Sequence, residues 1–192
     1  MTQYICKLTL ERLCAKNIIK EEDREIYLYG LELLIATIFK GLVIVIIGAL
    51  TRLIKEMLIF TLFFSGLRIQ AGGYHAKTIL GCLIGTLTII FTSITLVRIL
   101  PEDYQSYYIL ISMVASVVLI FLYAPLESEN KPLSKEEKVL YRHRSLQTVI
   151  IGNIIILILI AFSDKFNYLG SIASTGFFIE SLTIIHNLKD KK

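Results

Sequence analysis

The residues best suited to chemistry are a histidine and a cysteine seven positions apart, His75 and Cys82, in a short polar stretch between two apolar runs. An imidazole beside a thiol supplies the base and the nucleophile of nucleophilic cysteine chemistry. Two adjacent glycines, Gly72 and Gly73, precede His75 and permit backbone angles that other residues resist. We therefore expect the chain to turn sharply just before His75.

The spacing of His75 and Cys82 restricts how the two side chains can meet. On one straight α-helix, seven residues place two side chains on nearly the same face but roughly 10 Å apart along the axis. A general base needs contact at about 3 Å, so one unbroken helix cannot carry both groups. Thr78 is a suitable N-cap for a helix that begins at Ile79. His75 would then lie on the preceding loop, and Cys82 at the end of the first helical turn, where the helix dipole favours a thiolate.

The composition indicates a membrane protein. The 192-residue chain is 55% hydrophobic and only 19% charged, whereas soluble domains have about 45–50% apolar and about 25% charged residues. Its apolar residues form six runs, near residues 31–50, 53–67, 79–100, 107–125, 146–163 and 168–186. Most runs reach the roughly 17–25 residues that cross a bilayer, and the second is short enough to cross incompletely. We predict one membrane domain over residues 1–192, an all-α integral membrane protein with six transmembrane helices.

The distribution of positive charge predicts the topology. With a cytoplasmic N-terminus, the inner segments are 1–30, 68–78, 126–145 and 187–192, and they hold 15 of the 20 lysines and arginines, whereas the outer segments hold four. Such a bias is typical of cytoplasmic loops. We therefore expect both termini in the cytoplasm, residues 1–29 as an amphipathic helical region on the inner surface, and the His75 stretch at the cytoplasmic face.

The longest predicted inner segment, near residues 126–145, is basic. Ser134 and Glu137 have the spacing of a capping box and predict a short basic helix. Two interpretations of this segment stay open: a docking surface for an acidic peptide or a substrate carboxylate, and a lipid-facing basic loop that only sets the topology. The basic residues concerned are Lys131, Lys135, Arg142 and Arg144.

These motifs resemble those of the accessory gene regulator B (AgrB) family of Gram-positive bacteria. The first match is Arg68-x6-His75-Ala76-x5-Cys82, with Gly73 two positions before the histidine. The second lies in the inner segment, at Pro125, Pro132, Arg142 and Arg144. Length, number of apolar runs and the N-terminal region also agree, so the resemblance covers essentially the whole chain.

The resemblance implies a membrane cysteine endopeptidase of quorum sensing that cuts the C-terminal tail from a small AgrD-type signal propeptide at the inner leaflet. Cys82 would be the nucleophile, His75 its base, and Arg68 and Gly73 would shape the site. The resulting thioester would be attacked by an internal cysteine or serine of the propeptide, which closes a thiolactone or lactone ring. Gln70 could orient His75 or donate to the oxyanion. The resemblance also implies a homodimer in a Gram-positive cell membrane.

Two other classes of function are compatible with a membrane protein of this size, a small-peptide transporter and a non-catalytic membrane scaffold. A transporter predicts ionisable residues deep in several spans, or inverted repeats, and the sequence indicates neither. A scaffold would be indifferent to loss of the Cys82 thiol. The sequence has no metal-ligand spacing, so no metal or cofactor is expected. The net charge of +4 reflects the lysines and arginines of the predicted inner segments and does not indicate nucleic-acid binding. Gly81 and Gly85 have a spacing that suits a helix–helix interface, within the chain or in a homodimer.

Overall fold

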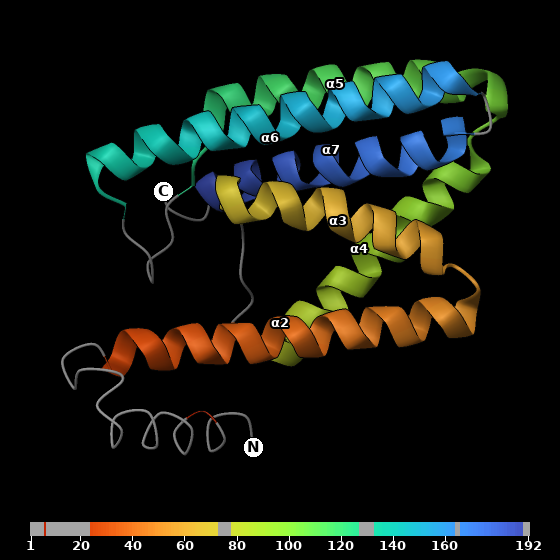
Figure 1. Ribbon diagram of the computed structural model, residues 1–192. Helices are drawn as coiled ribbons and strands as arrows, with labels where there is room; N and C mark the ends of the chain where they lie inside the picture. The colour runs from red at the N-terminus through yellow and green to blue at the C-terminus, as the bar shows by residue number, and fades with distance from the viewer. Residues whose placement is uncertain (1–5, 7–23, 73–77, 127–132, 164–165, 190–192) are drawn as a thin grey trace. The chain divides into compact units, whose positions relative to one another are not determined.

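The computed structural model describes residues 6, 24–72, 78–126, 133–163 and 166–189, and within these residues the regular structure is entirely helical (Figure 1). The helices are α2 (Arg24–Thr51), α3 (Ile54–Ala71), α4 (Ile79–Ile99), α5 (Glu102–Tyr123), α6 (Lys135–Phe162) and α7 (Asn167–Lys189). The prediction of an all-α protein is confirmed. The chain divides into two compact units, Met1–Ile47 and Gly48–Lys192.

Five of these helices are long and apolar enough to cross a membrane. The candidate spans are Gly30–Thr51, Leu80–Ile99, Glu102–Tyr123, Lys135–Phe162 and Asn167–Ile185. The remaining helix, α3, has 18 residues and includes Lys55, Glu56 and Arg68. The chain is therefore a membrane protein by its helices, whereas the sixth span and the cytoplasmic termini stay predictions.

The first unit contains most of α2. This helix begins at Arg24, upstream of the predicted span at residue 31. The last residues of the predicted amphipathic region are thus part of the same helix as the span, because no proline separates them and Gly30 alone does not end the helix. Apart from Cys6, the rest of that region lies outside the described residues.

The predicted short basic helix after Ser134 is wrong in its length. Its capping box is present: the Ser134 hydroxyl accepts from the Glu137 N–H at 3.2 Å, and the Glu137 carboxylate accepts from the Ser134 N–H at 2.9 Å. The helix that starts there continues without a break to Phe162, because the intervening polar residues are good helix formers and include no proline. The basic segment and the predicted span 146–163 are thus one helix, α6.

Helix α7 is the central helix of the second unit and packs against α3, α4, α5 and α6. Of its candidate span 61% is buried, against 28% in α4, α5 and α6. Glycines allow the close approach: a Cβ on Gly176 would lie 3.0 Å from the carbonyl oxygen of Phe60, and a Cβ on Gly152 would overlap the ring of Phe177. Small residues at contacts of this kind let helix backbones approach closely within a membrane.

Candidate functional site

The C-terminal end of α3 turns at a glycine. Gly72 has φ +76° and donates its N–H to the carbonyl of Arg68 at 3.0 Å. The carbonyl of the preceding residue, Ala71, accepts from the N–H of Leu126 at 2.9 Å. A Cβ on Gly72 would lie 2.5 Å from the carbonyl oxygen of Leu126. The left-handed backbone that the glycine pair permits is observed at Gly72, and the segment after α5 is hydrogen-bonded to this end of α3. The turn just before His75 stays a prediction, because Gly73 and His75 lie outside the described residues.

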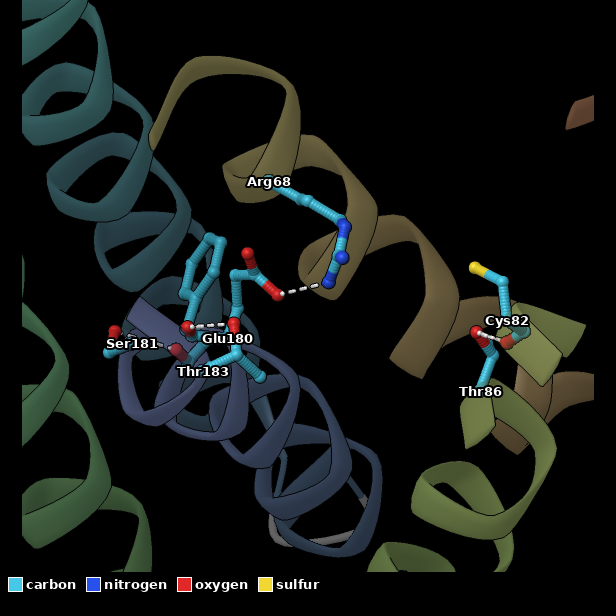
Figure 2. Close-up of polar contacts among 7 residues, drawn as sticks. Arg68, Cys82, Thr86, Glu180, Ser181 and Thr183 are labelled. Atoms are coloured by element: carbon cyan, nitrogen blue, oxygen red, sulfur yellow. Dashed lines mark hydrogen bonds and ion pairs between the residues drawn. The ribbon is translucent and has the colours of Figure 1, made fainter. Parts of the chain in front are cut away.

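Cys82 lies in the capped first turn of α4. The Thr78 hydroxyl accepts from the N–H of Gly81 at 3.1 Å, and the Thr78 carbonyl accepts from the N–H of Cys82 at 3.0 Å. One turn further on, the Thr86 hydroxyl donates to the Cys82 carbonyl at 2.8 Å (Figure 2). The predicted N-cap is therefore confirmed. The Cys82 side chain is half-buried, whereas Cys6 is fully buried.

An ion pair joins α3 to α7 just before the glycine turn. Arg68 Nη1 donates to Glu180 Oε2 at 3.1 Å (Figure 2). The guanidinium also lies 5.4 Å from the centre of the Phe64 ring. The Glu180 side chain is 0% exposed and that of Arg68 19%. The second carboxylate oxygen, Oε1, has no hydrogen-bond partner in the part of the chain that the structure describes. The last turn of α3 is thereby fastened to the central helix.

Two of the predicted polar site residues converge on one groove. Gln70 of α3 and Arg144 of α6 both line a cavity between these helices. Arg142 instead donates to the carbonyl of Phe121 at 3.0 Å and covers its ring at 5.3 Å, so it connects α6 to the end of α5. Lys135 is exposed in the first turn of α6 and does not line the groove.

Gly73, His75 and Lys131 lie outside the described residues. The pairing of His75 with Cys82 therefore stays a prediction. Within the described ranges, no group of three His, Cys, Asp or Glu side chains is arranged to hold a metal ion.

Comparison with known proteins decides the family. The profile of accessory gene regulator B matches residues 1–184. The chain belongs to the accessory gene regulator B family. Similar chains include AgrB-like proteins of Listeria innocua (29% identical over 168 residues, 82% of this chain and 81% of the relative), Listeria monocytogenes (28% over 182 residues, 90% and 88%) and Clostridium perfringens (27% over 143 residues, 72% and 67%). No solved structure matches this chain.

The family resemblance noted from the motifs is thus confirmed. Membership of the AgrB family indicates a role in processing a quorum-sensing peptide, and the apolar helices agree with its place in a membrane.

Glu180 is a residue beside the candidate site of this AgrB-family chain that sequence reasoning missed: it is the buried partner of Arg68. It is the one acidic residue in the predicted span 168–186, and an acidic residue inside a span is by default a functional candidate with a nearby partner. That signal would have identified Glu180. It would not have identified Arg68 as the partner, because the two residues are 112 positions apart.

Proposed function

We propose that the chain is a membrane cysteine endopeptidase that removes the C-terminal tail from a small AgrD-type signal propeptide. The Cys82 sulfur attacks the scissile carbonyl while the His75 imidazole accepts the thiol proton. The same proton then passes to the amine of the departing tail, and the peptide stays on Cys82 as a thioester. An internal cysteine or serine of the propeptide attacks that thioester and closes the ring, and its own thiol or hydroxyl proton passes to the departing Cys82 sulfur.

The observation that carries this proposal is the place of Cys82 in the capped first turn of α4, in a chain of this family. The helix dipole at that position favours a negative charge on sulfur. Three peptide units join His75 to Thr78, so their Cα atoms are at most about 11 Å apart. The connection is thus short, and the imidazole meets the first turn of α4 where the chain folds back toward that turn.

Arg68 acts in this proposal as a positioning residue. Its ion pair with Glu180 fastens the end of α3 four residues before Gly72, where the chain leaves the helix toward His75. The Leu126 N–H holds the same turn from the other side. With Thr78 capping α4, both ends of the connection that carries His75 are anchored.

The proposal includes six spans, cytoplasmic termini and a site at the inner face of a Gram-positive cell membrane, in a homodimer. The excess of lysine and arginine in the inner segments supports this topology. For α3, support comes from its ion pairs, since Glu56 contacts Arg98 at 3.4 Å and Arg68 contacts Glu180. Paired charges are far less costly in a membrane interior than isolated ones.

The test is tail release from the propeptide in membranes that contain the chain, followed by intact mass. We expect an acyl adduct and a free tail with the unchanged chain, and neither with Cys82→Ala. His75→Ala should lose tail release because the thiol then lacks its base, and Cys14→Ala is the matched control that should keep it. Unchanged processing by Cys82→Ala would overturn the cysteine mechanism and favour the scaffold or the transporter.

A further inference from the structure

A groove of about 550 Å³ lies between α3 and α6, and Phe177 of α7 also lines it. The two helices run antiparallel, with the C-terminal end of α3 beside the N-terminal end of α6 (Figure 1). Residues near these two ends therefore form one end of the groove. Residues nearer the middle of the two helices form the other end of the groove.

The two ends of the groove differ in chemistry. One is polar and carries a positive charge, through Gln70, Arg144 and Gln147. The other is apolar, through residues such as Leu62 and Ile155. A groove of this kind suits an amphiphile that has an anionic group at one end and a hydrocarbon chain at the other.

The length of the groove matches one leaflet of a bilayer. From Arg144 to Ile155 the helix rises roughly 16 Å, about half of the roughly 30 Å hydrocarbon core. An acyl chain laid along the apolar end would thus start at the depth of the headgroups and end near the middle of the membrane.

Two polar groups at the basic end are available to a headgroup. The Arg144 side chain is exposed, and the ion pairs found among the described residues, Arg68–Glu180 and Arg98–Glu56, do not involve it. The Gln70 Oε1 atom is buried and has no hydrogen-bond partner among those same residues. A guanidinium binds a phosphate strongly, and an amide oxygen accepts from a hydroxyl.

We propose that this groove binds one anionic phospholipid with a hydroxylated headgroup. The phosphate lies at Arg144, a headgroup hydroxyl donates to Gln70, and one acyl chain follows Leu62 and Ile155. A peptide segment or a second copy of the chain is a weaker match, because neither combines a single anionic group with a purely apolar tail of leaflet length. The site is independent of the cysteine chemistry proposed above.

The test measures phosphatidylglycerol bound to the purified full-length chain in detergent by native mass spectrometry, with phosphatidylcholine as the neutral comparison. Gly66 lines the groove, and a Cβ there would meet nothing within 4 Å, so Gly66→Leu places a side chain in the groove from a position whose Cβ is unobstructed. Gly85 on α4 is equally open and does not line the groove, so Gly85→Leu is the matched control. Arg144→Gln removes the charge at an exposed position, and Lys135→Gln is its control.

We expect the unchanged chain to prefer phosphatidylglycerol. Arg144→Gln should weaken its binding by about tenfold or more, as loss of a charge-assisted hydrogen bond does, and Gly66→Leu should weaken it because the added side chain takes the space of the acyl chain. The two control variants should bind as the unchanged chain does. Equal binding of the two lipids, or equal phosphatidylglycerol binding by all variants, would overturn the proposal. A change in propeptide binding or in oligomeric state, with lipid binding unaltered, would overturn it in favour of those occupants.

Discussion

At the ion pair between Arg68 and Glu180, substitutions can separate the contribution of charge to stability from that of side-chain packing. Arg68→Met and Glu180→Leu each remove one charge and keep much of the side-chain volume, and the double variant removes both. The pair is 3.1 Å long and largely shielded, with exposures of 19% for Arg68 and 0% for Glu180. The three variants should therefore differ in stability in a defined order.

The magnitudes follow from what each substitution leaves behind. Arg68→Met leaves a fully buried carboxylate without its counterion, which costs about 3–5 kcal/mol. Glu180→Leu leaves a guanidinium that is partly exposed and still lies over the Phe64 ring, so its cost should be nearer about 1–3 kcal/mol. The double variant leaves no unpaired charge and should unfold within about 1 kcal/mol of the unchanged chain.

The assay is the free energy of unfolding of the purified chain in mixed micelles titrated with dodecyl sulfate, analysed as a double-mutant cycle. Tail release is measured in parallel. We expect the double variant to recover stability but not tail release, because apolar side chains fill the space without the directional bond that fixes the end of α3. If the double variant loses as much free energy of unfolding as the two single variants together, the energetic reasoning is refuted. If the double variant releases the tail fully, the positioning role of Arg68 is refuted.

Three further pairs of substitutions test local features. Gly72→Ala should lower the melting temperature, because Gly72 has a positive φ and the added Cβ would collide with a carbonyl oxygen. Gly66→Ala adds its Cβ in open space and should raise the free energy of unfolding by about 0.5–1 kcal/mol. Equal effects of the two substitutions would contradict this account of the turn. Gly152→Ala should destabilise the contact between α6 and α7, because the added Cβ would overlap the Phe177 ring. Phe177→Leu in the same chain removes that ring and should restore stability. If the double variant is as unstable as Gly152→Ala in the unfolding assay, this contact is not the cause. Thr78→Ala should cost about 1 kcal/mol in the same assay through loss of the α4 cap, and Thr78→Ser should not; an equal loss in both would mean that the hydroxyl cap does not matter.

Local signals in the sequence predicted local structure well. The Thr78 cap and the Ser134 capping box were both identified from residue type and spacing alone, because a cap depends on residues three positions apart. Helix boundaries were less predictable. Hydropathy indicates where a helix enters lipid, whereas α2 and α6 begin earlier, because the residues before each predicted span include no proline that would end the helix.

In the candidate site, too, features set by neighbouring residues were predictable and contacts between distant residues were not. The first turn of α4 was predicted because its signals are adjacent in the chain. The contact of Arg68 with Glu180 and the shared groove of Gln70 and Arg144 depend on how α3 packs against α6 and α7, and the motifs contain no signal for that packing. Single residues could be nominated from their type, but their partners could not.

Helix α3 shows why hydropathy alone misjudges this part of the chain. Its charged residues keep it outside the five candidate spans, yet Glu56 near its start contacts Arg98 of α4, and Arg68 near its end contacts Glu180 of α7. Each of these charges is thus matched by an opposite one from a neighbouring helix, which lowers its cost in an apolar interior. Replacing Arg68 alone by an apolar residue would make α3 a better span by hydropathy and a less stable helix in the bundle, because the buried Glu180 would lose its counterion.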